Sequence, residues 1–430
     1  MGLHASTPPA GARHGHVPHP FLFLILFMPF GAVQGFTNVA LAYDLSKKGI
    51  DISGIAVLVA LGYVAQLGKW IWAPLVDTFF TRKTWYIGSA SLTGLGLWLG
   101  GAFATSGHIS MWTLNAALAL SNVACTFVGM SIESLMAASI PDAERGRASG
   151  WSQAGNLGGQ GIAGGIGLWL IQGAGLSTAG SGAVVGAMCA LCCLALLWID
   201  DSKPLVRVDG HLEIAERLGL RANVRAIAGD LWIMLRSRIG ILALLICVLP
   251  IGSGAAQNLW SPIADEWHAS ANVVALVNGA LSGVISMAGC LFGGWACDRM
   301  DRKTGYCLSG LLLAITAIGM ALCPHTSNQF IFWTSLYAFV IGLCYASYCA
   351  VVLEAVGRTS AATKFSFLSS LANAPLMYMT LVDGAANVRW GTNKMLWTEA
   401  WCGVAGLLVF MLVAGATRRR SIPAALAETA

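Results

Sequence analysis

Two short stretches of this chain, GWACDRMDRK at Gly294–Lys303 and APLVDTFFTRK at Ala73–Lys83, have the same layout. Each ends a long apolar run with an acid, Asp298 or Asp77, and follows it with an adjacent pair of cations. An acid and a basic turn after an apolar run are typical of the point where a membrane helix leaves the lipid. The two copies therefore predict a membrane protein in which one pattern occurs twice.

Other residues share the interval between these copies. Asp77 and Asp298 are 221 positions apart, and so are Pro29-Phe30-Gly31 and Pro250-Ile251-Gly252. A second set keeps an interval of 217 positions: Arg147 with Lys364, and Asn156 with Asn373. Consistent intervals predict duplicated halves, an architecture of transporters in which the solute site lies between the repeats.

The composition agrees with a membrane location. Of the 430 residues, 56% are hydrophobic and only 10% are charged, whereas soluble domains carry about 25% charged residues. The net charge of +5 comes from cations in short turns, with no basic patch interleaved with aromatics, so no nucleic-acid partner is expected. The twelve cysteines fall almost entirely in apolar runs and are interpreted as small apolar residues, without disulfides or a metal site.

Twelve apolar segments have roughly the 20 residues that a helix needs to cross a bilayer. They lie near residues 20–43, 52–77, 85–105, 111–138, 146–173, 179–199, 239–262, 270–297, 304–323, 329–356, 361–383 and 395–416. Helices satisfy their backbone groups internally in lipid, and the alternation of membrane β-strands is absent. The predicted fold is therefore all-α, with twelve transmembrane helices in two pseudo-symmetric six-helix halves.

The charges also predict the organisation of the chain. We expect an N-terminal tail at 1–19, six-helix bundles at 20–199 and 239–416, a linker at 200–238 with a surface helix around 213–225, and a C-terminal tail at 417–430. An even number of spans places both termini on one side, and 20 of the 25 Lys and Arg residues fall on that side. This bias predicts cytoplasmic termini, in a bacterial inner membrane.

These motifs resemble those of the major facilitator superfamily. Its signature is G-x-x-x-D-R-x-G-R-K, which Gly294–Lys303 matches except that Asp301 replaces the second glycine. The copy at Ala73–Lys83 lacks the first glycine and is one residue longer. The resemblance implies the two-bundle fold and a transport function.

Three further stretches resemble one group within that superfamily, the peptide/acetyl-coenzyme A transporters, which include AmpG-like muropeptide permeases. KWIWAPLVD at Lys69–Asp77 is similar to the group's K-F-L-W-x-P-L-x-D. Pro141–Gly146 is similar to L-P-x-E-E-R-G, and Ala362–Leu371 to S-A-T-Q-F-A-L-L-S-A-L. The group carries a second carboxylate where Gly129 stands here, so the resemblance in substrate is incomplete.

A carboxylate at a helix end can accept hydrogen bonds from the N-terminus of a neighbouring helix. Contacts of this kind exist in only one arrangement of the two halves, so they can bias an inward/outward equilibrium. By resemblance, these turns form the conformational latch of the superfamily. The predicted latch residues are Asp77, Arg82, Lys83, Asp298, Arg299, Arg302 and Lys303. The alternative is that their charges only set the topology.

Lys69 lies eight residues before Asp77, which is about 12 Å along a helix and near mid-membrane. A cation at that depth costs several kcal/mol unless it is paired or wetted. Glu133 is expected at a similar depth, so we predict that the two share a cavity and serve proton coupling or solute binding. Glu354 is a third candidate, although an interfacial salt bridge with Arg358 or Lys364 is an alternative. Snorkelling to the interface is the alternative for Glu133 and Lys69.

Uncharged polar residues mark the faces expected to line the cavity. Gln153 and Asn156 share one face of their span with Gln160, at helical spacing. The predicted cavity residues are Gln34, Asn38, Asn122, Gln153, Asn156, Gln257, Asn258, Trp260, Tyr337, Tyr345, Tyr348 and Asn373. The alternative role for each of them is a hydrogen bond between helices.

The resulting hypothesis is proton-coupled uptake of a medium-sized, muropeptide-like polar solute by a monomer, with protons and membrane lipid as its other partners. Import of a siderophore or other metal chelate, export of drugs or metabolites, and a non-transporting sensor remain alternatives. No nucleotide-binding motif, Gly-x-Ser-x-Gly elbow or His-x-x-x-His pair is present. We therefore expect neither an enzyme nor a cofactor.

Overall fold

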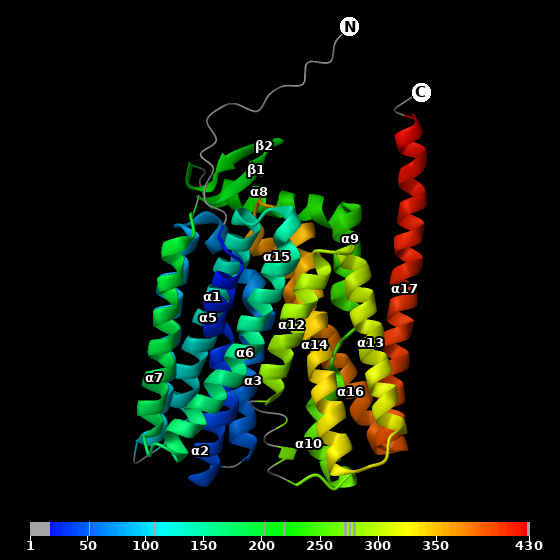
Figure 1. The fold of residues 1–430 in the computed structure, drawn as a ribbon. Coiled ribbons are helices and arrows are strands. Elements are labelled where there is room, and N and C mark those ends of the chain that lie inside the picture. Colours follow the sequence, from blue (N-terminus) through cyan, green and yellow to red (C-terminus); the bar gives the residue numbers. More distant parts are fainter. Residues whose placement is uncertain are drawn as a thin grey trace.

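The computed structural model describes residues 18–50, 52–106, 109–201, 203–217, 220–270, 273–274, 277 and 281–427. Most of the predicted N-terminal tail lies outside this part of the chain. The described part is almost entirely helical, and its helices form two bundles that lie side by side (Figure 1). The predicted all-α fold with two six-helix halves is confirmed.

The first half contains the six predicted spans. Its first span continues through a π-helical stretch, and its last ends in a 3-10 segment. The elements are α1 (Phe21–Gly35), η1 (Phe36–Leu41), α2 (Ala42–Lys47), α3 (Ile52–Thr78), α4 (Arg82–Thr105), α5 (Met111–Ser139), η2 (Asp142–Glu144), α6 (Arg145–Gln172), α7 (Thr178–Leu191) and η3 (Cys192–Trp198).

The second half has less regular helices. Its elements are α9 (Arg238–Val248), η5 (Ala255–Leu259), α10 (Trp260–Ile263), η6 (Ala264–Trp267), α12 (Ser282–Cys297), α13 (Arg302–Leu322), α14 (Ser327–Val356), α15 (Ala361–Leu371), α16 (Asn373–Trp390) and α17 (Thr392–Ala427). Part of the eighth predicted span, 270–297, lies outside the described residues. The last helix continues to Ala427, well into the stretch expected to be a tail.

The seventh span is not the continuous helix that the sequence predicted over 239–262. It breaks after Val248 and resumes as short helical turns from Ala255. Pro250 has no N–H to donate, and Gly252 and Gly254 both take positive φ, at 64° and 69°. The equivalent Pro29 lies inside a continuous helix. The same Pro-x-Gly motif is thus accommodated within a helix in one half and breaks the helix in the other.

The linker between the halves also differs from the prediction. Instead of a helix around 213–225, strands β1 (Leu205–Val208) and β2 (His211–Ile214) form an antiparallel hairpin, followed by η4 (Ala215–Arg217) and α8 (Leu220–Arg236). The hairpin turn is Asp209-Gly210, and both residues take positive φ, as a tight two-residue turn requires. The helix α8 then meets α9 at a bend of 84°. We call this end of the bundles the linker end.

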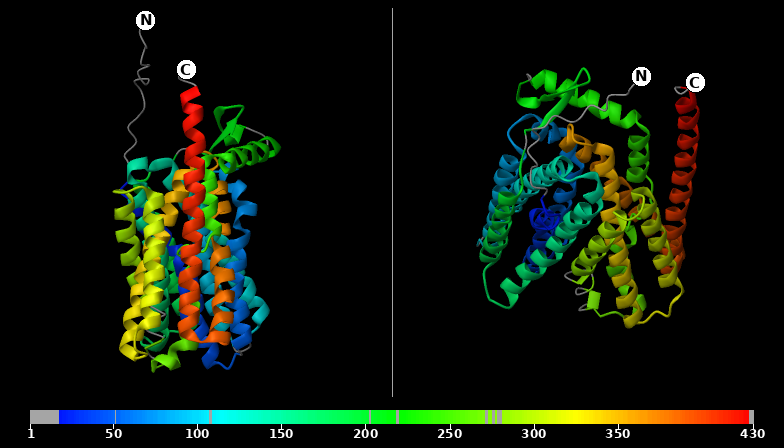
Figure 2. Two further views of the ribbon diagram at one scale, coloured as in Figure 1. Left: turned by 90° about the vertical axis from the view of Figure 1, so that its right-hand side faces the viewer. Right: turned by 45° about the horizontal axis from the view of Figure 1, so that its top comes forward.

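The two halves meet mainly at the linker end and diverge towards the other end (Figure 2). One apolar cluster of buried residues there draws on both halves and the linker, including Phe23, Ile132, Leu353, Phe365 and Met234. The helices α6 and α12 approach so closely that a Cβ on Gly150 would lie 2.7 Å from the Cα of Gly294. Small residues allow such backbone contact in lipid.

Candidate transport cavity

A cavity of about 550 Å³ lies between the halves, within the size range of small-molecule sites. It is lined by helices of both halves and by the unwound backbone of the seventh span. Ten of the twelve residues predicted to line it do so: Gln34, Asn38, Gln153, Asn156, Gln257, Asn258, Trp260, Tyr345, Tyr348 and Asn373. Asn38 lies in the π-helical stretch η1, a distortion that is frequent at functional sites.

Lys69 from α3 and Glu133 from α5 both line this cavity, as expected. Their side chains are buried, at 4% and 3% exposure. Lys69 Nζ lies 5.9 Å from the ring centroid of Phe30, and Glu133 Oε2 accepts no hydrogen bond from any described residue. Among the described residues neither forms a direct ion pair. Two opposite charges thus face one space between them, which a polar solute or water can occupy.

Amides dominate the rest of the polar lining. On α6, Asn156 Nδ2 donates to Gln153 Oε1 at 3.1 Å, which orders both side chains on the cavity face. Asn258 Nδ2 donates to Thr380 Oγ1 at 3.0 Å and so ties η5 to α16. Amides with aromatic neighbours can both donate and accept hydrogen bonds, so the lining suits a solute with many polar groups.

Three predicted site residues lie elsewhere. Asn122 Nδ2 donates to the carbonyl of Leu118 within its own helix, and Tyr337 donates to Glu399 at 2.5 Å, away from the cavity. Glu354 is bound by Arg302 Nη1 at 3.3 Å and Lys303 Nζ at 2.8 Å at the linker end. Its partners differ from the Arg358 or Lys364 that the sequence suggested, because the basic turn before α13 lies against the end of α14.

Several further residues that line the cavity were not among those predicted. Gln66 is one turn before Lys69 on the same face of α3, and it lines the cavity. That helical spacing was a signal available in the sequence. Ser253 lines it only because the seventh span unwinds there, and no spacing rule for a helix could have found it.

At the linker end, each half caps a helix of the other. Asp77 at the end of α3 accepts hydrogen bonds from the backbone N–H groups of Ala362 at 3.2 Å and Thr363 at 2.8 Å, in the first turn of α15. Asp298 after α12 accepts from the N–H of Arg147 at 3.0 Å and from its Nε at 3.1 Å, in the first turn of α6. Both carboxylates stabilise helix N-termini across the interface.

The basic residues of the two turns have separate partners. Arg82 Nη1 lies 3.3 Å from Asp201, where the linker begins, and the N–H of Lys83 donates to the same carboxylate. Arg299 instead stacks on Trp295 within its own half, with its guanidinium carbon 4.0 Å from the ring centroid, and donates to the carbonyl of the same residue.

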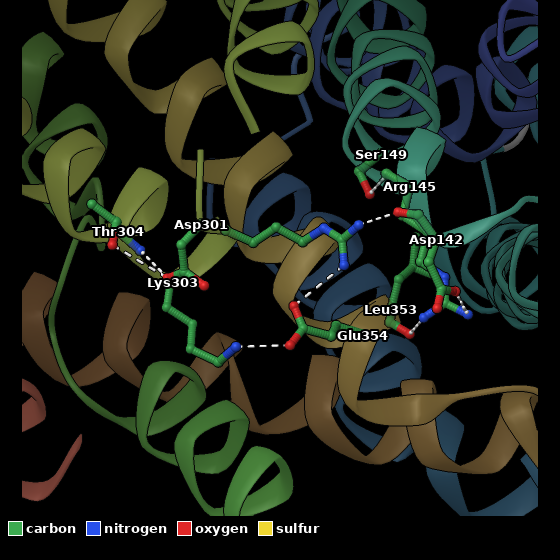
Figure 3. Close-up of polar contacts among 9 residues, drawn as sticks. Asp142, Arg145, Ser149, Asp301, Lys303, Thr304, Leu353 and Glu354 are labelled. Atoms are coloured by element: carbon green, nitrogen blue, oxygen red, sulfur yellow. Dashed lines mark hydrogen bonds and ion pairs between the residues drawn. The ribbon is translucent and has the colours of Figure 1, made fainter. Parts of the chain in front are cut away.

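A second set of contacts surrounds Glu354 (Figure 3). Arg302 reaches from Glu354 to the carbonyl oxygen of Asp142 in the first half. Arg145, from the first half, donates to the carbonyl of Leu353 in the second at 3.2 Å. The bonds that Asp77, Asp298, Arg145 and Arg302 make across the two halves all lie at this end of the molecule, and Ser370 Oγ donates to the carbonyl of Gln66 at 3.2 Å nearby. The linker end is therefore closed.

Comparison with known proteins agrees with this arrangement. A model of the Major Facilitator Superfamily matches residues 22–374. The chain belongs to the major facilitator superfamily. It is therefore a multi-pass membrane transport protein and not an enzyme. No curated protein sequence matches it at a significant level.

Solved structures of this superfamily share the fold. The E. coli fucose:proton symporter superposes with a TM-score of 0.69 at 13% identity, covering 92% of this chain and 98% of its own. A proton:xylose symporter bound to 6-bromo-6-deoxy-D-glucose gives 0.67 at 13%, covering 90% and 94%. The human organic anion transporter gives 0.64 at 12%, covering 91% and 97%. At these identities the likeness shows the fold alone.

Proposed function

We propose that this protein is a proton-coupled transporter that takes up a medium-sized, polar, muropeptide-like organic solute by alternating access. The observation that carries the proposal is the buried pair Lys69 and Glu133, which faces one central cavity without a direct ion pair. A charged residue inside a membrane bundle is costly, and it is typical of solute or ion pathways.

Lys69 is suited to bind a carboxylate of the solute. It is buried and its neighbours in the lining are mainly amides and aromatic rings. A cation and several amides around about 550 Å³ favour a solute that combines an anionic group with peptide-like or sugar-like hydrogen bonding. The sequence motifs of the muropeptide permease group support this choice, and the similarity in fold to an organic anion transporter is consistent with it.

Glu133 is suited to exchange the coupling proton. Charged, it attracts Lys69 and competes with the carboxylate of the solute; protonated, it leaves Lys69 to the solute. Solute and proton then bind together, which is the requirement for symport. Two proteins of the same fold are named as proton symporters, and this supports the choice of a proton as the coupling ion.

The closed linker end gives a direction to the cycle. The excess of Lys and Arg on that side predicts that it is cytoplasmic, so this arrangement corresponds to an outward-facing monomer with its tails and linker inside the cell. We propose that the cross-capping acids Asp77 and Asp298 form the latch that opens when the bundles at 20–199 and 239–416 rock.

The test is flux into proteoliposomes with an imposed proton gradient. Anhydro-muropeptides, siderophores and simple sugars are offered as labelled solutes. Glu133→Gln should abolish accumulation against a gradient while solute exchange continues, because the amide cannot release a proton. Lys69→Met should weaken solute binding by roughly 10- to 100-fold, the range of a lost charged hydrogen bond. Glu266→Gln, on an exposed turn, is the matched control and should behave as the parent.

The outcomes separate the alternatives. Equal transport by the parent and by both cavity variants would refute the proposal. Siderophore uptake without muropeptide uptake would assign a chelate importer, and accumulation only with the reversed gradient an exporter. Binding without flux under all gradients would assign a sensor.

A further inference from the structure

Two acidic side chains lie buried in the second half, away from the solute cavity. Asp383 on α16 is 0% exposed, and Glu399 on α17 is 6% exposed. The two helices pack against each other, like charges on the two carboxyl groups would repel, and neither acid lines the cavity. Their surroundings are apolar, since the same two helices contribute Ala386, Leu396 and Ala400 to one buried apolar cluster.

Glu399 joins three separate elements. Its Oε1 accepts a hydrogen bond from the hydroxyl of Tyr337 on α14 at 2.5 Å and another from the N–H of Ala256 in η5 at 3.4 Å. Tyr337 packs edge-on against Trp260, with ring centroids 5.1 Å apart, and Trp260 lines the cavity. The carboxyl of Glu399 thus holds the unwound part of the seventh span, one residue layer from the solute site.

Three oxygens of the pair are left without donors. Within the part of the chain that the structure describes, no hydrogen bond reaches either carboxyl oxygen of Asp383 or Oε2 of Glu399. The titratable groups that face the pair are Tyr337 from α14 and Cys402 from α17. No cation forms an ion pair with either acid in the part of the chain that the structure describes.

Two unpaired carboxylates in an apolar surrounding would each cost several kcal/mol. One proton on the pair removes one of the two buried charges and the repulsion between them, and with these most of that cost. Like-charged acids that share a site cannot both be ionised for the same reason. A metal cation is a poorer occupant, since no group of three or more acidic, His or Cys ligands occurs among the described residues.

We propose that Asp383 and Glu399 hold one proton between them, as a second protonation site outside the solute cavity. Release transfers the proton from the carboxyl O–H to solvent water and leaves two repelling carboxylates beside η5. The repulsion loosens the contact of Glu399 with Tyr337 and Ala256, and so frees the broken seventh span to move. The role in transport rests on the proposed function, but the bound proton does not.

The proton is tested directly by infrared spectroscopy of the full-length protein in lipid nanodiscs. Protonated carboxyl groups have a C=O stretch separate from that of carboxylates. The parent should show such a band at neutral pH, and combining Asp383→Asn with Glu399→Gln should remove it, because no carboxyl group is then left at the site to hold the proton. Glu133→Gln and Glu266→Gln should leave the band. A band that survives in the double variant, or one that added Na⁺ removes at constant pH, would overturn the proposal.

A second measurement does not depend on the variants folding. The folded parent holds a proton that the unfolded chain releases at neutral pH, so its unfolding temperature should fall as the pH is raised. Tyr337→Phe keeps both acids and should keep the infrared band at a shifted position. No such pH dependence in the parent, with no band, would also overturn the site.

The two proposals can fail separately. If Glu133→Gln transports like the parent while the infrared band depends on Asp383 and Glu399, the proposed coupling residue is wrong and this site stands. If Glu133→Gln loses proton-driven accumulation while the band is independent of both acids, this site is wrong and the proposed function stands.

Discussion

The two cross-capping acids, Asp77 and Asp298, occupy equivalent positions in the repeat but work in different surroundings. Asp77 is 2% exposed and binds two backbone N–H groups. Asp298 has a side chain of 9% exposure and relies partly on the side chain of Arg147, which is 50% exposed. Both repeats therefore cap a helix of the opposite half, but the donors that bind the two carboxylates differ.

The cause of the difference is the linker. Arg147 and Lys364 are repeat equivalents, and Arg147 pairs with the acid of its own latch. Lys364 instead pairs with Asp230 of α8, with Nζ to Oδ2 at 2.9 Å and both side chains buried. Because only one linker joins the two halves, only one of the two latches is covered by it. We expect the Asp77 side to hold the linker end closed more strongly than the Asp298 side.

The largest effect should come from Asp77→Ala. It removes a charged acceptor from two N–H groups, at about 1.5 kcal/mol each. Together they amount to roughly a 100-fold loss of protection for the amides of Ala362 and Thr363 in hydrogen exchange. Asp77→Asn keeps an acceptor oxygen and should lose less. Unchanged protection in Asp77→Ala would show that the cap does not hold the interface.

The second-largest effect should come from Asp230→Ala. It leaves Lys364 without its carboxylate, at a cost of about 2 kcal/mol. That is below the usual cost of breaking a buried pair, because Lys364 Nζ keeps the carbonyl of Val356 and Thr359 Oγ1. Hydrogen exchange should rise along α8. Glu213→Ala, on the exposed hairpin, is the control. Equal hydrogen exchange in both variants would show that the linker does not cause the difference between the two capping acids.

Gly150→Ala tests whether packing compensates for the weaker Asp298 latch. Its Cβ would lie 2.6 Å from the carbonyl oxygen of Cys290 and 2.7 Å from Gly294 Cα, so α6 and α12 must separate. Overpacking of this kind costs about 1–3 kcal/mol and should lower the unfolding temperature. Gly88→Ala, where a Cβ meets nothing within 4 Å, should not lower it. A stable Gly150→Ala protein would mean that this helix pair is not tightly closed in the membrane.

The smallest effect is expected for Arg147→Gln. An exposed ion pair is worth about 0.5 kcal/mol, and the N–H of residue 147 still donates to Asp298. Exchange of the first amides of α6 should rise about twofold, and raising the salt concentration should reproduce the change in the parent. The contact of Asp77 should be insensitive to salt. A loss comparable with that of Asp77→Ala would show that the two latches are equal after all.

Much of the fold was predictable because it depends on local pattern. Lipid requires long apolar helices, and duplication leaves a constant interval, so the spans, the repeat and ten of twelve cavity residues followed from the sequence. Where the observed elements differ from the prediction, the sequence carries a local signal for the difference: Asp209-Gly210 is typical of a hairpin turn, and Pro250 with two nearby glycines breaks a helix. Asp383 and Glu399 were equally visible as acids within apolar spans.

The hydrogen-bond and ion-pair partners of the side chains could not be predicted in this way. The sequence by itself determined a duplicated membrane transporter fold, the cations at one end and a cavity with Lys69 and Glu133, since helical period and hydropathy specify which face is polar. Only the tertiary structure decided that Glu354 binds Arg302 and Lys303, that Lys364 binds Asp230, and that Tyr337 turns from the cavity to Glu399. Those pairings join residues many positions apart, and they depend on how the helices are rotated and tilted, which no single span encodes.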